Sequence, residues 1–476
     1  MQTELFIANE WRPGTSGSTI AVINPATEEL VAEVASAGAA EVDAAVQAAH
    51  TCFESDEWRA LPARRRGALL YRAGELLLER RNDVATLETR QNGKPLFESK
   101  IDVQMAAETL KYYGGWADKI GGRVLPVATR DFVFTDRVPL GVVGAIVPWN
   151  FPLNLASWKF APALATGCTV VLKPASETPL TALAMAEIML EAGFPAGAFN
   201  VIPGSGSVAG AELVRHPIVA KISFTGSTEV GKQVMRDAAD TVKRVTLELG
   251  GKSPNVIFAD ADLKAAVRGA QNGIFYGKGE VCAAGSRLLV ERSVHDQVVE
   301  QLAERAGRLV PGDPFDKGTR LGAVVSRKQQ ETVLSYIEAG KSEATLVAGG
   351  NPAQVDGKGY FVEATVFDDA KPGMRIVDEE IFGPVLSVIS FDSVDEAVAL
   401  ANRTIYGLAA GVWTRDISKA LTVARAIRAG TVWINTYNLY DPMAPFGGFK
   451  QSGFGRDLGQ EALDGYTESK TVWVGL

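Results

Sequence analysis

The sequence predicts an α/β protein made of two doubly wound lobes and a small β arm. Short apolar runs alternate with helical patterns from residue 140 to residue 249, and a second series of this kind begins after residue 251. Such alternation is typical of mainly parallel sheets that are covered by helices. The length of 476 residues also exceeds the size at which a single hydrophobic core stops growing.

The first lobe is expected to hold strands at residues 141–147, 169–172, 199–202, 220–224 and 245–247. Just after strand ends come four residues that could face a ligand: Asn150, Lys173, Gly226 and Glu248. Ligands of doubly wound sheets bind outside the carboxyl ends of the strands. We therefore expect these four residues along one ligand-binding edge.

The small arm is expected where residues 123–127 and 131–135 form a hairpin that interrupts the first lobe. Its alternating apolar residues need a cover. The sequence is equally compatible with two covers for this hairpin. One is a contact with another subunit, shared with the terminal segment 471–474, and the other is the hairpin's place as an internal edge strand.

The second lobe begins near Gly251, with strands expected at residues 255–258, 286–290, 385–389 and 431–435. The resulting division assigns residues 1–118 and 139–250 to the first lobe, 119–138 and 460–476 to the arm, and 251–459 to the second lobe. A ligand site at the interface of the two lobes follows from this division.

Composition excludes several functional classes. The formal charge of -8 includes no basic cluster, which argues against nucleic-acid and anionic-membrane partners. No basic segment followed by an apolar run begins the sequence, and no apolar stretch of about eighteen residues occurs. We expect a cytoplasmic protein without a membrane segment.

The cysteines point to one nucleophile. Cys52, Cys168 and Cys282 are widely spaced and form no C-x-x-C pair, which argues against a disulfide framework and against a metal site. Cys168 begins an apolar strand and is expected to pack as a small core residue. Cys282 lies among small residues at 279–287 that leave its sulfur reachable.

A thiol nucleophile needs a group that manages protons. With only three histidines in the chain, the carboxylate of Glu248 is the better candidate, against the alternative of a glutamate in a surface turn. Asn150, held between aromatic residues and prolines at 148–152, could stabilise an oxyanion. From these residues alone, an N-cap of the helix that begins at Phe151 is the favoured interpretation of Asn150.

Two further segments could bind a dinucleotide. Gly226 and Ser227 lie between a strand and a helix, where free N–H groups favour a phosphate, although a simple turn is an equal alternative. Lys173 ends a strand at the ligand edge and could donate to ribose hydroxyls, where a lone lysine is usually solvated.

The motifs together resemble the aldehyde dehydrogenase superfamily over nearly the whole chain. The segments that carry the resemblance are 24–27, 148–152, 173–174, 224–227, 248–252, 279–287, 379–384 and 445–453, in this order. The resemblance implies a Rossmann-like cofactor domain in the first lobe and a catalytic domain in the second. It also implies a homodimer or homotetramer joined through the arm.

The same resemblance implies site roles. Cys282 would be the nucleophile, Glu248 the base that activates water, and Asn150 with the Cys282 backbone N–H the oxyanion hole. The residues implied to bind NAD or NADP are Trp149, Lys173, Ser176, Gly226, Ser227, Glu380 and Phe382. The implied reaction oxidises an aldehyde to the carboxylic acid through a thiohemiacetal and a thioester. A CoA-acylating enzyme and a catalytically silent homologue are the alternatives.

The chain departs from the family pattern at two places. Ser176 replaces a glutamate common in NAD-preferring members, so the choice between NAD and NADP stays open. Lys278 and Glu280 stand where the family often has glutamine. Solvation of these charges, or their pairing with each other, is favoured over an effect on the field near the substrate.

Five aromatic residues match positions that shape the family's substrate tunnel: Phe151, Trp158, Tyr276, Tyr440 and Phe446. They imply an apolar or aromatic aldehyde, and packing in the core is the competing interpretation for each one. No arginine marks a carboxylate-binding site in the sequence, which disfavours semialdehydes.

Overall fold

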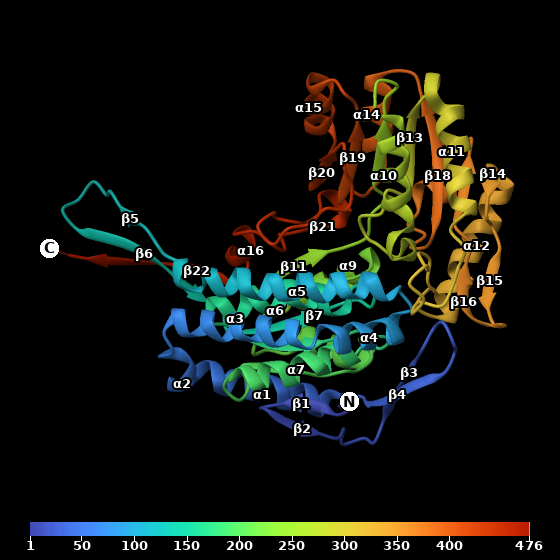
Figure 1. Ribbon diagram of the computed structural model, residues 1–476. Helices are drawn as coiled ribbons and strands as arrows, with labels where there is room; N and C mark the ends of the chain where they lie inside the picture. Colours follow the sequence, from blue (N-terminus) through green and yellow to red (C-terminus); the bar gives the residue numbers. More distant parts are fainter. Residues whose placement is uncertain (476) are drawn as a thin grey trace.

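The computed structural model describes residues 1–475 and holds two large sheets, each flanked by helices, with a narrow β arm at one side (Figure 1). The first sheet runs in the order β2 (Glu10–Arg12), β1 (Leu5–Ile7), β9 (Phe199–Val201), β8 (Thr169–Lys173), β7 (Val142–Ile146), β10 (Val219–Thr225), β11 (Arg244–Glu248) and β21 (Gly453–Phe454). The strands from β9 to β11 are parallel, and those at both edges are antiparallel.

Helices cover both faces of the first sheet. They are α1 (Ala39–Glu54), α2 (Asp56–Arg59), α3 (Ala63–Glu79), α4 (Arg81–Asn92), α5 (Leu96–Trp116), α6 (Pro152–Thr166), α7 (Leu180–Ala192), α8 (Ala211–Arg215) and α9 (Thr228–Ala239). Every residue of α6 is buried, as expected for a helix that is apolar on all sides. It begins with Pro152 in its first turn and ends at Gly167, whose φ of 97° suits glycine.

The second sheet has the order β14 (Thr345–Ala348), β17 (Thr365–Asp368), β18 (Val385–Phe391), β13 (Arg287–Glu291), β12 (Pro254–Ile257), β19 (Ala409–Trp413) and β20 (Thr431–Ile434). All pairs are parallel except β14 with β17. Its helices are α10 (Leu263–Phe275), α11 (His295–Gly307), α12 (Arg327–Glu343), α13 (Arg375–Asp378), α14 (Val394–Asn402) and α15 (Ile417–Ala426). The two doubly wound sheets confirm the predicted fold class.

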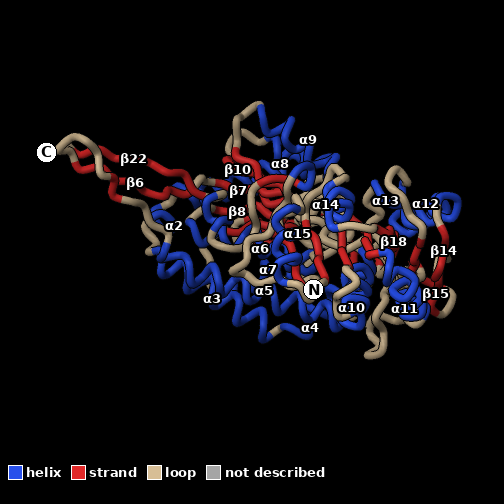
Figure 2. The backbone as a smooth tube through the Cα atoms, turned by 90° about the horizontal axis from the view of Figure 1, so that it is seen from above, coloured by secondary structure: helices blue, strands red, loops and turns tan. Residues whose placement is uncertain are grey.

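The arm is a three-stranded sheet of β5 (Val124–Leu125), β6 (Phe132–Pro139) and β22 (Thr467–Val474). β6 pairs with β22 along its whole length, from Phe132 opposite Val474 to Pro139 opposite Thr467. Figure 2 shows that this pair extends away from the body of the molecule. The predicted hairpin therefore has the terminal strand as its partner, and β6 is longer than expected.

Several elements were not predicted from the sequence. The β21 strand crosses back from the last part of the chain to the edge of the first sheet, beside β11. Two hairpins, β3 (Thr19–Ile23) with β4 (Leu30–Ala35) and β15 (Pro352–Val355) with β16 (Lys358–Val362), and the short helix α16 (Glu461–Asp464) complete the fold. Single turns of helix lie at Ala117–Lys119, Gly206–Gly210, Tyr276–Gly279, Arg292–Val294 and Lys450–Ser452.

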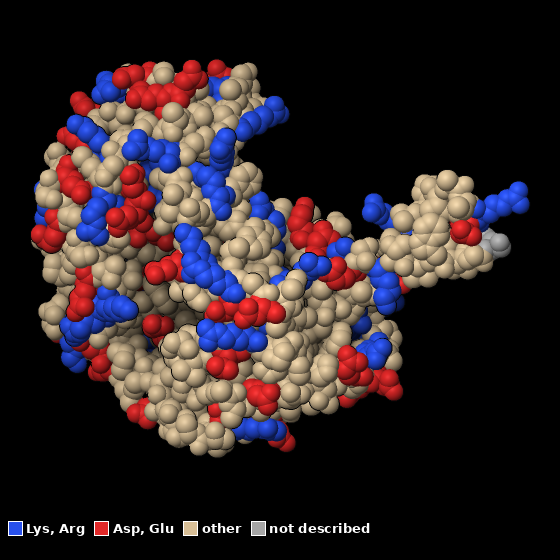
Figure 3. Space-filling model, turned by 180° about the vertical axis from the view of Figure 1, so that it is seen from behind, with Lys and Arg blue, Asp and Glu red and all other residues tan. Residues whose placement is uncertain are grey.

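The surface charges and the helices are consistent with the sequence, which has no basic cluster and no long apolar stretch. Acidic and basic side chains are interspersed on the face shown in Figure 3, whereas the arm is mostly uncharged there. Within residues 1–475, no helix combines the length and the apolar character that crossing a bilayer requires.

Candidate active site

A cavity of about 870 Å³ is lined by residues of both lobes. The wall includes Cys282 together with all five aromatic residues that the sequence singled out: Phe151, Trp158, Tyr276, Tyr440 and Phe446. Cys282 is half-buried, whereas Cys52 and Cys168 are buried. The structure therefore places a reachable sulfur on the wall of a mainly apolar cavity.

Three of these aromatic rings pack against one another. The ring centroids of Trp158 and Phe446 lie 5.5 Å apart, as do those of Tyr440 and Phe446, and the Trp158–Tyr440 distance is 6.1 Å. The Trp158 indole donates to Asn154 Oδ1 at 3.1 Å, which satisfies its N–H inside the protein. The mutual packing fixes a rigid apolar wall near the sulfur.

Burial, together with the nearby carboxylates of Glu380 and Glu248, raises the pKa of the Cys282 thiol to about 12. The sulfur is consequently a thiol at neutral pH when no cofactor is bound. A group that accepts its proton, or a positive charge beside it, is needed before it can act as a nucleophile.

Glu248 ends β11 and is buried, so the surface-turn interpretation is wrong. Burial raises the pKa of its carboxyl well above the ordinary value, and the charge of Asp457 acts in the same direction, against Lys159. Within residues 1–475 its Oε2 atom has no hydrogen-bond partner. Lys159 itself forms a buried ion pair with Asp457 at 2.9 Å. A desolvated carboxylate of this kind is a strong proton acceptor once it is ionised.

The glycines at 250 and 251 make room for two groups of the site. A Cβ atom on Gly250 would lie 2.2 Å from Glu380 Oε2, and one on Gly251 would lie 2.2 Å from the Cys282 carbonyl oxygen. Any larger residue would therefore push apart the segments that carry Glu380 and Cys282. The close approach explains why residues 250 and 251 are both glycine.

Asn150 does not cap α6, because the helix has no side-chain cap at its N-terminus. Its Nδ2 atom instead donates to the Glu280 carbonyl oxygen at 2.9 Å, and its own carbonyl accepts from Lys94 Nζ at 2.7 Å. The amide has two hydrogens, so one remains for another acceptor. The helix-cap interpretation favoured by the sequence is wrong. The Asn150 amide is instead bonded to Glu280, which lies two residues before Cys282 in the chain.

The carboxyl ends of β8, β7, β10 and β11 lie at one edge of the first sheet, because these strands are parallel neighbours. Lys173 ends β8, and burial lowers its pKa to about 8. Ser227 is exposed at the start of α9, where its Oγ accepts from the Val230 N–H at 3.3 Å. Gly226 donates its N–H to the Glu248 carbonyl at 3.1 Å. Ser176 donates to the Gly204 carbonyl at 3.3 Å.

The remaining predicted cofactor residues lie beside this edge. The rings of Trp149 and Phe382 meet edge to face with centroids 5.2 Å apart. Glu380 accepts from the Gly251 N–H at 2.9 Å, and burial raises its pKa to about 7. An exposed helix N-terminus, a lysine and a carboxylate along one edge fit the phosphates and hydroxyls of a dinucleotide.

Lys278 and Glu280 form an ion pair with an Nζ–Oε2 distance of 2.8 Å. Both side chains are about 1% exposed, so they are not solvated, and the pairing interpretation is the correct one. Burial lowers the pKa of Lys278 and raises that of Glu280.

Sequence reasoning missed two sets of residues on the cavity wall. Phe97, Ile101 and Met105 lie along one face of α5, and their spacing of four residues was the available signal. Arg268, Arg305 and Arg320 also line the cavity, although no arginine marked a carboxylate-binding site in the sequence. These arginines are far apart in the sequence and follow no motif, which is why the pattern did not indicate them.

Comparison with known proteins gives one consistent result. The family model described as "Aldehyde dehydrogenase family" matches residues 11–472. Retinal dehydrogenase 2 of Homo sapiens is 49% identical over 476 residues, which cover 99% of this chain and 92% of the relative. Two solved structures match this chain with a TM-score of 0.98. Each match covers 100% of this chain and 97% of the solved chain. They are the NAD+ complex of the aldehyde dehydrogenase from Bacillus cereus, 49% identical, and P. syringae AldA, an indole-3-acetaldehyde dehydrogenase in complex with NAD+ and IAA, 47% identical.

Proposed function

The chain belongs to the aldehyde dehydrogenase family, and we propose that Cys282, Glu248 and Asn150 carry out its oxidation of aldehydes to carboxylic acids. The observation that carries this proposal is the position of Cys282 on the cavity wall, where the charge of Glu248 acts on its thiol and the Asn150 amide is bonded to Glu280, two residues before it in the chain. The enzyme uses a nicotinamide dinucleotide, as the NAD+ complexes of similar proteins indicate.

In the proposed reaction the Cys282 thiolate adds to the aldehyde carbon and forms a thiohemiacetal. The Asn150 amide and the Cys282 backbone N–H stabilise the negative oxygen. Bound NAD or NADP would supply the hydride acceptor, and loss of hydride from the former aldehyde carbon would leave that carbon as a thioester on the Cys282 sulfur. Glu248 then takes a proton from water, the resulting hydroxide attacks the thioester, and the acid leaves with return of the thiolate.

The carboxylate of Glu248 favours this hydrolytic route over transfer of the acyl group to CoA. Its burial and its unpartnered Oε2 support the role of a base that becomes available to a water molecule. A catalytically silent homologue is disfavoured because the chain has the thiol, the carboxylate and the amide that the proposed reaction requires.

For the cofactor we propose contacts along the edge of the first sheet. Lys173 and Glu380 would hold the two ribose rings, Gly226, Ser227 and the N-terminus of α9 the pyrophosphate, and Trp149 with Phe382 the sides of the cleft. The hydroxyl of Ser176 carries no charge that would repel a 2′-phosphate, which supports acceptance of NADP as well as NAD.

For the substrate we propose an apolar or aromatic aldehyde, supported by the wall of Trp158, Tyr440 and Phe446. A second candidate is an aldehyde with a carboxylate at its far end. Arg268, Arg305 and Arg320 favour it, because a guanidinium on the cavity wall could bind such a group.

The organisation of the chain remains a proposal in two respects. The lobe with residues 1–118 and 139–250 would bind the dinucleotide, and residues 251–459 would form the catalytic domain. Residues 119–138 and 460–476 would join subunits into a homodimer or homotetramer. The exposed side chains of Phe132 and Trp473 on the arm support this role.

The test is a panel of aromatic, aliphatic and carboxylate-bearing aldehydes, each measured with NAD and with NADP. We expect reduced cofactor and the carboxylic acid, with kcat/KM highest for aromatic aldehydes and no requirement for CoA. Cys282→Ser should abolish the activity. Activity in that variant, or product formation that depends on CoA, would contradict the proposal.

A further inference from the structure

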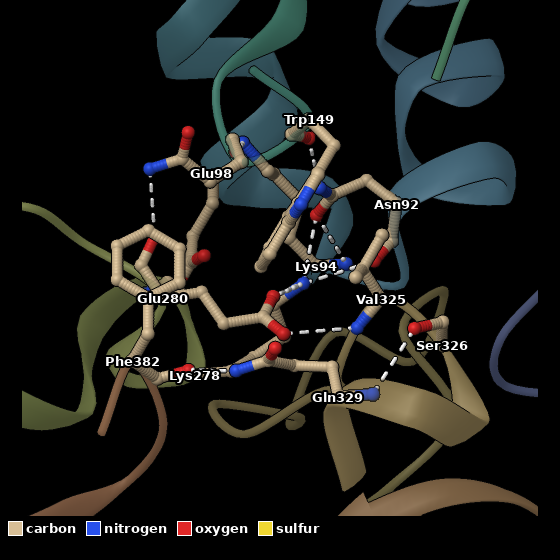
Figure 4. Close-up of polar contacts among 12 residues, drawn as sticks. Asn92, Lys94, Glu98, Trp149, Lys278, Glu280, Val325, Ser326, Gln329 and Phe382 are labelled. Atoms are coloured by element: carbon tan, nitrogen blue, oxygen red, sulfur yellow. Dashed lines mark hydrogen bonds and ion pairs between the residues drawn. The ribbon is translucent and has the colours of Figure 1, made fainter. Parts of the chain in front are cut away.

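The turn that leads into Cys282 has an unusual backbone and a buried charge pair. Gly277, Lys278 and Gly279 have φ values of 59°, 61° and 71°, and lysine rarely adopts this left-handed conformation. The conformation directs the Lys278 side chain into the protein, where it meets Glu280 at 2.8 Å. Figure 4 shows that the pair lies among residues of several other segments. A strained backbone that carries a buried ion pair needs contacts that hold it in place.

Lys278 connects the turn to the segment that precedes Asn150. Its Nζ atom donates to the Asn92 carbonyl at 2.9 Å and to Asn92 Oδ1 at 2.8 Å. The Asn92 side chain in turn donates to the Trp149 carbonyl at 2.8 Å. A change at Lys278 is therefore transmitted to the residue next to Asn150 through one intermediate side chain.

Glu280 contacts Asn150 directly. Its carbonyl oxygen accepts from Asn150 Nδ2 at 2.9 Å, while its side-chain Oε1 accepts from the Val325 N–H at 2.9 Å. The carboxylate thus anchors the residue on two sides, to Lys278 and to the segment before α12. The anchored carbonyl fixes which way the Asn150 amide points.

A second cation holds the other end of Asn150. Lys94 donates to the Asn150 carbonyl at 2.7 Å and is paired with Asp102 at 2.5 Å. This lysine fixes the backbone of Asn150 but not the rotation of its side-chain amide. That rotation depends on the hydrogen bond to Glu280.

We propose that Lys278 and Glu280 are positioning residues that set the direction of the Asn150 amide toward the reacting oxygen. The inference rests on the proposed function, which makes that amide a donor to the oxyanion. Loss of one charge leaves the other buried without its counter-charge, and we expect the turn to relax away from Asn150. Loss of both charges, with side chains that keep the hydrogen bonds, leaves the turn in place.

The test compares Glu280→Gln, Lys278→Gln and the double variant with the wild-type enzyme. Each single variant should lower kcat about tenfold, while the KM for NAD stays within about twofold. The double variant should recover to within about threefold of wild-type kcat, because two amides can bond to each other, to Asn92 and to the Val325 N–H. Asp392→Asn, which breaks the exposed pair with Arg292, is the control and should change nothing.

A second comparison separates positioning from a merely structural role. In an Asn150→Ala background, Glu280→Gln should have no further effect on kcat, because the amide it would misplace is gone. Alkylation of Cys282 by iodoacetamide should be unchanged in Glu280→Gln, since this displacement forms no oxyanion. Equal losses in both backgrounds, slower alkylation, or a double variant no better than the single ones would overturn the inference. Wild-type activity in Asn150→Ala alone would instead contradict the proposed role of Asn150.

Discussion

The sulfur of Cys282 lies in surroundings that do not favour the thiolate. Burial and the carboxylates of Glu380 and Glu248 raise the pKa of its thiol. We therefore expect formation of the thiolate at neutral pH to depend on the positive nicotinamide of the bound cofactor, whereas Glu248 would act later, as the base in hydrolysis of the thioester. We therefore expect iodoacetamide to label Cys282 slowly in the enzyme without cofactor, and this slow reaction would not show that the protein is a catalytically silent homologue.

Alkylation of Cys282 without cofactor should accelerate with pH. Because the thiol pKa is raised to about 12, the thiolate fraction is small at pH 7 and grows about tenfold per pH unit. We expect the iodoacetamide rate to rise from pH 7 to pH 10 without a plateau. Cys282→Ser reports the background from the buried Cys52 and Cys168. A plateau below pH 8 would show that the protein stabilises the thiolate.

Central strands and their helices were predictable from the sequence because buried parallel strands are continuous apolar runs. The predicted strand at 169–172 corresponds to β8 at Thr169–Lys173, and the predicted strand at 199–202 corresponds to β9 at Phe199–Val201. Edge elements were not predictable on the same basis. β21 has only two residues and pairs with β11 from a distant part of the chain, so no local pattern marks it.

In the site, too, features marked by the local sequence were predictable, whereas contacts between residues far apart in the chain were not. Cys282, Glu248 and Asn150 became candidates because each follows a strand or lies in a distinctive motif. The cap interpretation of Asn150 was wrong because its partner, the Glu280 carbonyl, is 130 residues away. The Lys278–Glu280 pair was open for a similar reason, since burial depends on Asn92 and Val325 and is not visible in the sequence.

At the scale of the whole molecule, the arm carries the exposed apolar side chains that assembly would cover. Phe132 is 43% exposed and Trp473 is 59% exposed, on paired strands far from the core. Replacing both with aspartate should lower the mass in light scattering, because charged residues oppose burial in a subunit contact. Ile417→Asp, at an exposed position on α15, should leave the mass unchanged. A wild-type protein that is already monomeric would contradict the proposed role of the arm.

The two-lobed architecture brings the parts of the chemistry together. The first lobe contributes Glu248 and Asn150 at the carboxyl ends of its strands, and the second contributes Cys282 after α10. The cavity between them gives a substrate access to the sulfur. We therefore expect aldehyde oxidation to depend on how the two lobes are placed against each other, and the hydrogen bond from Lys278 to Asn92 joins them.

The most direct test of the account is the covalent state of Cys282 in a Glu248→Gln enzyme given NAD and an aromatic aldehyde. With the base removed, the thioester should form but not hydrolyse, which gives about one equivalent of NADH per subunit in a single burst. Mass spectrometry should then find the acyl group on the peptide that contains Cys282. Continued turnover at the wild-type rate, or an acyl group on any other residue, would contradict the assignment of Cys282 and Glu248 as nucleophile and base.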